Sequence, residues 1–130
     1  MPKRRCNFLK KVDGLYFDAG FRKFNIEVKE NLLDGGTECW GSTDFDQCTI
    51  YLRANADRDT AKETLIHEIT HVILTTVGLG GYDKGEMGEE FPDGYIGPTN
   101  NEHLTLCVSR GFMCAFNLNK ELFEIILEKE

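Results

Sequence analysis

The sequence predicts an α+β domain in which a small twisted sheet, antiparallel or mixed and containing a hairpin, packs on a long helix and later helices. Three observations indicate this class: strand-like segments in the first half of the chain, an apolar helical pattern around residues 60–77, and helical patterns again after residue 100. The 130 residues are enough for one hydrophobic core, so residues 1–130 are interpreted as a single domain.

The composition indicates a globular protein with an acidic surface. The sequence has 22 Asp and Glu residues against 15 Lys and Arg residues, a formal net charge of −7. This charge disfavours nucleic acid as a partner, because phosphate binding needs a basic surface. No apolar run approaches the roughly 18 residues of a membrane span, and no signal-peptide pattern follows the basic start. We therefore expect a cytoplasmic monomer that binds neither nucleic acid nor membrane.

The start of the chain is predicted to contribute little before the first clear strand. Residues 1–14 are basic and show no periodic pattern, so we expect a flexible start. Residues 15–17 fit either a short strand or a helix. Residues 24–29 alternate apolar and polar side chains, which predicts a half-buried strand.

A β-hairpin is predicted in the next segment. Residues 38–41 and 48–53 are rich in strand formers and flank the polar residues 42–47, which fit a longer connection. The side chains of the second strand that we expect to face the core are Ile50, Leu52 and Ala54.

The remaining chain is predicted to be helical on both sides of one long loop. The first helix runs to about Val77 and stops at Gly78, with its start capped by Thr60 or by Asp59. Residues 78–99 are rich in glycine and acidic residues, and this loop fits a lid over a cleft or a disordered segment equally well. Helical patterns then continue from residue 100 to the end, interrupted at Asn117 and Asn119.

The five cysteines show no metal-binding or catalytic pattern. No C-x-x-C pair is present, which argues against a zinc ribbon. Their odd number favours reduced thiols, with a disulfide between Cys39 and Cys48 as the less favoured alternative. Cys107 and Cys114 are two helical turns apart, and we expect both to pack in the core.

The helix predicted over residues 60–77 carries the motif H-E-x-x-H, formed by His67, Glu68 and His71. Residues four apart lie on one face of a helix, so both imidazoles can bind one metal ion. Glu68 is expected at the edge of the same face, within reach of a metal-bound water but not as a ligand. The apolar stripe on the opposite side of the helix includes Leu65, Ile69 and Val72. The pattern is typical of a zinc hydrolase with one zinc ion.

A catalytic zinc site usually has three protein ligands and one open position, so a third ligand is needed. In the metzincin pattern this ligand is a histidine at the position that Val77 occupies here, which excludes that motif. The other histidine is His103, and a carboxylate from the later helix is the leading candidate. Glu102 is best placed, although Thr99-Asn100-Asn101-Glu102 also fits a capping box. The alternatives in the loop are Glu89, Glu90 and Asp93.

Four features between residues 24 and 128 match the pattern of a known family. They are Trp40-Gly41 before a hairpin turn, Thr49-Ile50-Tyr51-Leu52, the stretch from Lys62 to His71, and Asn101-Glu102 opening a helix that leads to Asn117. In these features the chain resembles the ImmA/IrrE-type metallopeptidases of phages and mobile elements, which belong to the gluzincin group. The resemblance implies that Glu102 is the third zinc ligand, beside His67 and His71, and that Glu68 is the general base.

The resemblance also implies the chemistry of a peptidase with restricted substrate choice. Zinc activates a water molecule, and Glu68 takes its proton as the water attacks an amide carbonyl. A His or Tyr often stabilises the oxyanion in this group, and the candidates are His103, Tyr82 and Tyr95. By analogy with larger gluzincins, an extended protein or peptide substrate is expected to pair with the edge strand near Gly41 or Cys48.

Two other functions fit the same residues. In the first, zinc stabilises a non-catalytic module whose loop and hairpin bind a partner protein. In the second, the site hydrolyses an amide in a molecule other than a protein. Size and composition do not separate these functions, because substrate choice depends on the loops that build the cleft walls.

Overall fold

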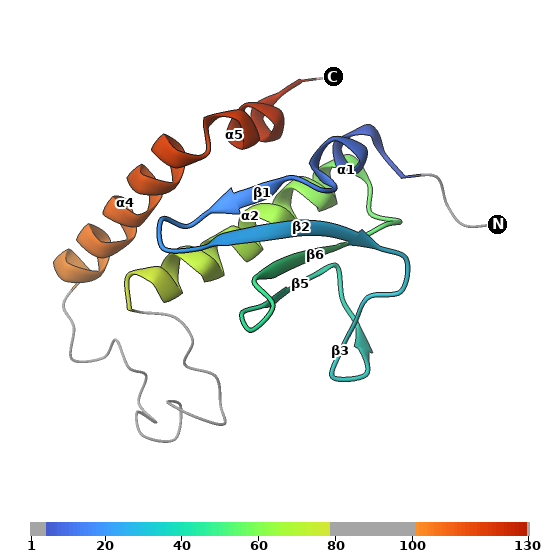
Figure 1. The fold of residues 1–130 in the computed structure, drawn as a ribbon, viewed down its shortest axis with the longest axis horizontal. Coiled ribbons are helices and arrows are strands. Elements are labelled where there is room, and N and C mark those ends of the chain that lie inside the picture. Colours follow the sequence, from blue (N-terminus) through green and yellow to red (C-terminus); the bar gives the residue numbers. More distant parts are fainter. Residues whose placement is uncertain (1–4, 79–100, 130) are drawn as a thin grey trace.

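The structure is a computed structural model that describes residues 5–78 and 101–129 (Figure 1). It is an α+β fold with a small mixed sheet of four strands and with helices packed on it. The elements in chain order are α1 (Asn7–Val12), β1 (Tyr16–Asp18), β2 (Lys23–Lys29), β3 (Leu33–Asp34), β4 (Thr37–Glu38), β5 (Gly41–Asp44), β6 (Thr49–Arg53), α2 (Arg58–Thr76), α4 (Asn101–Leu118) and α5 (Lys120–Leu127). The predicted class is confirmed, with strands before the long helix and two helices after it.

The main sheet has the strand order β1-β2-β6-β5. β1 is antiparallel to β2, β2 is parallel to β6, and β5 is antiparallel to β6. The parallel pair arises because the chain passes through the small β3–β4 pair and through β5 before β6 enters the centre of the sheet. In the sheet as described, only β6 pairs with β5, so β5 is an edge strand.

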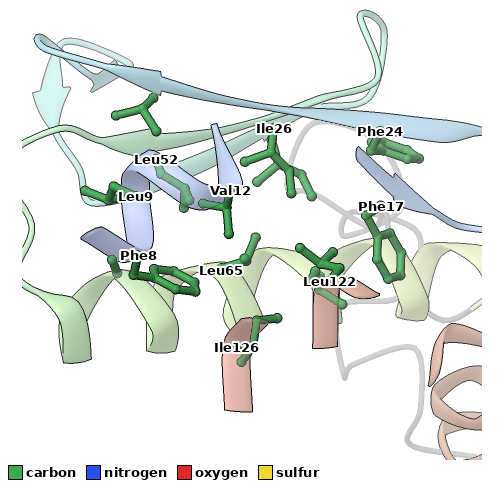
Figure 2. Packing of buried hydrophobic residues seen from close by; sticks show 14 of the residues in the cluster. Phe8, Leu9, Val12, Phe17, Phe24, Ile26, Leu52, Leu65, Leu122 and Ile126 are labelled. Atoms are coloured by element: carbon green, nitrogen blue, oxygen red, sulfur yellow. The ribbon is translucent and has the colours of Figure 1, made fainter. Parts of the chain in front are cut away.

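The two central strands supply the sheet's share of the core. Side chains of β2 alternate between exposed and buried, as its sequence pattern predicted. Ile26 lies beside Ile50 and Val28 beside Leu52, so all four point to the same face of the sheet. Figure 2 shows the core between this face and the helices, with these labelled residues: Phe8, Leu9, Val12, Phe17, Phe24, Ile26, Leu52, Leu65, Leu122 and Ile126.

The predicted hairpin forms, but its first strand lies later in the sequence than expected. β5 begins at Gly41, and residues 42–44, predicted as part of the connection, belong to the strand. The turn starts after Asp44, whose Oδ1 accepts hydrogen bonds from the backbone N–H groups of Asp46 (2.9 Å) and Gln47 (3.0 Å). The side chain of Asp44 thus stabilises a tight turn, and the connection between the two strands is shorter than the predicted residues 42–47. The side chains predicted to face the core are buried: Ile50, Leu52 and Ala54.

α2 has nearly the predicted length but a different N-terminal cap. The Oδ1 atom of Asp57 accepts a 2.8 Å hydrogen bond from the backbone N–H of Thr60, so Asp57 is the N-cap. The predicted caps, Thr60 and Asp59, are wrong, because both residues lie within the first turn of the helix. α2 ends at Thr76, and Gly78 follows with a left-handed φ of 83°.

The segment before β1 is partly helical. Residues 7–12, which the sequence placed in a flexible start, form α1. Its Phe8, Leu9 and Val12 are buried, and the helix packs on α2 and α5. These three apolar side chains hold the short helix in the core. The sequence-based prediction missed it because the basic residues dominate the composition of this segment. Of the two alternatives for residues 15–17, a short strand or a helix, the structure shows the strand, which is β1.

The break between α4 and α5 is at Asn119, one of the two positions predicted to interrupt the helical pattern. Its side chain is buried and makes three hydrogen bonds. The Oδ1 atom accepts from the backbone N–H of Asp18 (2.6 Å), and Nδ2 donates to the carbonyl oxygens of Asp18 and Ala115 (both 2.8 Å). One buried amide therefore ties β1 to the bend between the two C-terminal helices. None of the helices in the described ranges is long and apolar enough to cross a membrane.

The cysteines are thiols, as predicted, and the alternative disulfide between Cys39 and Cys48 does not form. Cys107 is half-buried, but Cys114 is exposed, so the expectation that Cys114 fills core space is wrong. The reason is the face that α4 turns toward α2. Gly111 and Ala115, one turn apart, lie on that face, and position 114 is rotated by about 100° from position 115.

Replacing Asn119 with alanine is expected to destabilise the fold strongly. The change leaves the partly buried backbone N–H of Asp18 without its acceptor and opens a small cavity, so the free energy of unfolding should fall by about 2–4 kcal/mol. Urea unfolding measures this difference. Asn117→Ala is the matched control, since Asn117 is exposed in the last turn of α4, two residues before Asn119. Equal stability of the two variants would contradict the structural role of Asn119.

Candidate metal centre

His67 and His71 form a close pair on the exposed face of α2. Their Nε2 atoms are 3.1 Å apart, and their ring centroids are 4.7 Å apart at an interplanar angle of 77°. The His67 side chain is 66% exposed. On the other side of the helix, Leu65 and Ile69 are fully buried. The prediction that the histidines face away from the core is confirmed.

The spacing of the possible ligand atoms fits a single small cation. Two nitrogen ligands at the usual distance from a tetrahedral zinc ion are about 3.3 Å from each other, close to the 3.1 Å between the two Nε2 atoms. One ligand atom from each of His67, Glu68 and His71 lies within 4.8 Å of the others. Two imidazoles next to a carboxylate are also the ligand types that zinc sites use. The two imidazole nitrogens therefore have a spacing that suits one metal ion such as zinc, with the carboxylate of Glu68 beside them.

Glu68 is more enclosed than the sequence suggested. It was expected at the edge of the histidine face, but its side chain is only 9% exposed. Thr43, in β5, donates a 2.7 Å hydrogen bond from its hydroxyl group to Oε1 of Glu68. The other oxygen, Oε2, lies 4.0 Å from Nε2 of His67. The two carboxylate oxygens therefore have different surroundings, one on the sheet side and one on the histidine side.

The register of β5 explains how Thr43 reaches Glu68. In the antiparallel pair, Thr43 lies opposite Ile50 and Gly41 lies opposite Leu52. Directly opposed residues point to the same face of a sheet, so Thr43 and Gly41 share the face that packs on α2. Sequence reasoning missed Thr43 because it placed residues 42–47 in a connection. Residues 41–44, Gly-Ser-Thr-Asp, show no alternation of apolar and polar side chains, so the periodicity of the sequence held no signal for this strand.

Gly41 allows β5 to approach α2 closely. A Cβ atom at this position would lie 2.4 Å from Cγ2 of Thr64 and 3.3 Å from Cγ of Glu68. The first distance is far below any real carbon–carbon contact, so a larger residue would push the strand away from the helix. Gly41 also begins the edge strand of the described sheet, at the position where the sequence predicted such an edge.

A cleft of about 410 Å³ opens beside the motif, along the N-terminal half of α2. The lining residues are Trp40, Gly41, Thr60, Glu63, Thr64, His67 and Glu68. The ring of Trp40 is half-exposed, and the guanidinium group of Arg53 lies over it at 5.2 Å from the ring centroid. Arg53 in turn pairs with Glu38 at 3.0 Å. The cleft thus has an aromatic wall at Trp40 and reaches the start of β5 at Gly41.

The predicted third ligand, Glu102, lies in the first turn of α4, and its side chain is outside the described residues. α4 packs tightly on α2 at Gly111, where a Cβ atom would lie 2.6 Å from Cγ2 of Ile73. Gly111 follows Glu102 by nine positions, which corresponds to a rise of about 13 Å along the helix. α4 runs antiparallel to α2 (Figure 1), so the part of α4 that precedes Gly111 extends toward the C-terminal end of α2. The structure brings together the three motif residues, and the third ligand stays a prediction.

Several other candidates cannot be placed relative to the motif. His103 belongs to the first turn of α4, and its side chain is outside the described residues. Residues 79–100, and with them nearly all of the predicted glycine- and acid-rich loop, are outside as well. The candidates that fall on this segment are Tyr82, Glu89, Glu90, Asp93 and Tyr95. Their roles as oxyanion stabiliser or alternative ligand stay predictions.

Replacing Gly41 with alanine is expected to disturb both the fold and the motif. The added methyl group meets Thr64, so the free energy of unfolding should fall by about 1–3 kcal/mol. A second substitution, Thr64→Ser, removes the Cγ2 atom in question and should restore part of that loss in the double variant. Urea unfolding of the two single variants and the double variant measures the coupling. Strictly additive effects would contradict a direct contact between positions 41 and 64.

Comparisons of this chain with protein-family models, with curated proteins and with solved structures gave no match. The candidate metal centre therefore rests on the geometry of α2 and β5. The properties that bear on function are the imidazole pair, the enclosed carboxylate and the cleft beside them.

Proposed function

We propose that this protein is a zinc-dependent metallopeptidase that cleaves peptide bonds in a restricted protein substrate. The observation that carries the proposal is the arrangement of two exposed imidazoles 3.1 Å apart beside an enclosed carboxylate. Burying a carboxylate is unfavourable unless it is hydrogen-bonded, and this chain provides the bond through Thr43. A histidine pair that merely faces solvent needs no such neighbour, whereas a hydrolytic site needs a general base.

The roles of the motif residues follow from their positions. His67 and His71 would hold the ion through the nitrogen atoms that face each other. Zinc bound at this position acts as a Lewis acid and makes a water molecule nucleophilic at neutral pH. Glu68 would take a proton with Oε2, the oxygen on the histidine side, because Oε1 already accepts the Thr43 hydrogen bond.

The shape of the site supports a peptide as substrate. In the described sheet β5 pairs with β6 alone, and the backbone N–H and C=O groups on its other side would let an extended peptide add as a further strand. The cleft of about 410 Å³ lies beside this strand and reaches His67 and Glu68. A small amide needs no strand edge for binding, so the edge favours a protein substrate over a non-protein amide.

The sequence resemblance to ImmA/IrrE-type peptidases supports the same assignment. A gluzincin-like site would take Glu102 as its third ligand. For this carboxylate to reach the imidazole pair, the start of α4 would have to come closer to the middle of α2 than its present packing at Gly111 brings it. For that reason the carboxylates of the loop remain alternative third ligands, and mutagenesis distinguishes them from Glu102.

Zinc analysis of the purified protein tests the metal and the base separately. We expect one zinc ion per chain. His67→Ala removes a ligand and should abolish stoichiometric binding. Glu68→Gln should keep the zinc but lower kcat for a cleaved protein substrate by about 10²–10⁴-fold, because the general base is lost.

Glu27→Gln is the control for these variants, since Glu27 is exposed on β2 and lies outside the cleft. It should keep both zinc and activity. Absence of zinc from the wild-type protein would overturn the proposal. Bound zinc with a biological effect that Glu68→Gln leaves intact would instead favour the non-catalytic module.

Substitution of single carboxylates identifies the third ligand. If Glu102 binds zinc, Glu102→Ala should weaken zinc binding by about 10-fold or more in competition with a chelator. Glu89→Ala, Glu90→Ala and Asp93→Ala serve as parallel variants and should bind zinc as the wild-type protein does. A loss confined to one of these three variants would transfer the assignment to the loop.

A further inference from the structure

We propose that Thr43 is a positioning residue for the general base, and that its hydrogen bond selects Oε2 of Glu68 as the oxygen that takes the proton. The inference rests on the peptidase function proposed above. It assigns a role to a residue of the sheet, outside the H-E-x-x-H motif. Its basis is the 2.7 Å hydrogen bond between Thr43 Oγ1 and Glu68 Oε1.

The direction of this hydrogen bond is fixed by its chemistry. An ionised carboxylate only accepts hydrogen bonds, so the threonine hydroxyl must be the donor. Both partners are partly enclosed, since the Glu68 side chain is 9% exposed and β5 is half-buried along its length. A bond from a hydroxyl to a charged acceptor in such a place is among the stronger hydrogen bonds in proteins. It therefore holds Glu68 more firmly than a solvent contact could.

The consequence for Glu68 is an asymmetric carboxylate. A free glutamate side chain rotates about its last torsion and exchanges its two oxygens. Here Oε1 is held by the sheet, and Oε2 lies 4.0 Å from Nε2 of His67. In the described part of the chain, Thr43 makes the one hydrogen bond found for this carboxylate. Loss of the hydroxyl group would therefore release the torsion that presents Oε2 to the site.

The position of Thr43 also connects the base with substrate binding. Thr43 points its side chain toward α2, while the edge of β5 that has no strand partner among residues 5–78 and 101–129 carries the backbone groups that a peptide would pair with. A peptide bound at this edge and the oriented Glu68 are thus placed by the same strand. We infer that Thr43 acts on the chemical step more than on substrate binding, because its hydroxyl group faces the helix and not the edge.

Two substitutions separate the hydroxyl group from the packing of the side chain. Thr43→Val keeps the size and branching of the side chain but removes the donor, whereas Thr43→Ser keeps the donor and removes a methyl group. We expect Thr43→Val to lower kcat by about 10–100-fold with little change in KM, as loss of a supporting hydrogen bond does. Thr43→Ser should stay within about threefold of the wild-type kcat. Both variants should bind one zinc ion.

A measurement without substrate or metal tests the contact itself. In the metal-free protein, NMR couplings should show a single χ1 rotamer for Thr43 and a hydroxyl proton protected from exchange. Both signals should be lost in Glu68→Ala, which removes the acceptor. An averaged rotamer in the wild-type protein would overturn the proposal without any assay of activity.

The outcomes distinguish this proposal from the proposed function. Wild-type cleavage that depends on Glu68, together with an unchanged kcat in Thr43→Val, overturns the role of Thr43 and leaves the peptidase intact. A Thr43→Ser variant as slow as Thr43→Val also overturns it, because packing and not the hydroxyl group would then matter. Absence of cleavage by the wild-type protein overturns the peptidase and, with it, any catalytic role for Thr43, while the NMR signals still report whether the contact exists.

Discussion

The close contact between β5 and α2 is the constraint on which the candidate site depends. At Gly41 the strand and the helix approach so closely that a Cβ atom would lie 2.4 Å from Thr64. This approach encloses Glu68 and brings the Thr43 hydroxyl group to 2.7 Å from its carboxylate. Without it, α2 would present a solvated glutamate between two histidines, as many exposed helices do. A backbone position without a side chain thus determines the surroundings of the charged residue.

A second glycine contact holds α2 from another direction. Gly111 lets α4 approach Ile73, and the side chain of Asn119 ties the break between α4 and α5 to β1. At the other end of α2, the Nζ atom of Lys62 donates to the carbonyl oxygen of Glu128, just after α5. The motif helix is therefore packed between the sheet and the C-terminal helices, and its histidine face remains exposed. Side chains on such a helix keep their spacing, because the sheet and the C-terminal helices both pack against its backbone.

Local periodicity was enough to predict the class of fold and the histidine pair. The alternation of residues 24–29 and the apolar stripe behind His67 are properties of single elements, and both are confirmed. The parallel pairing of β2 with β6, the cap at Asp57 and the start of β5 at Gly41 were missed. Strand pairing depends on contacts between distant segments. The N-cap of α2 and the start of β5 depend on which of several neighbouring polar residues forms the cap or begins the strand. A single sequence does not contain these choices in its periodicity.

The enclosure of Glu68 shows that the chemistry of a motif depends on its tertiary surroundings as well as on its sequence. By helix geometry alone, Glu68 belongs to the edge of an exposed face, and the sequence offers no reason for it to be buried. Its surroundings come from β5, some 25 residues earlier in the chain, through the hydroxyl group of Thr43. The imidazoles stay exposed, where a metal ion can reach them, while the carboxylate is largely enclosed and accepts the Thr43 hydrogen bond. These opposite environments on adjacent residues require a sheet edge beside the helix, so the hydrolytic proposal depends on the tertiary fold as much as on H-E-x-x-H.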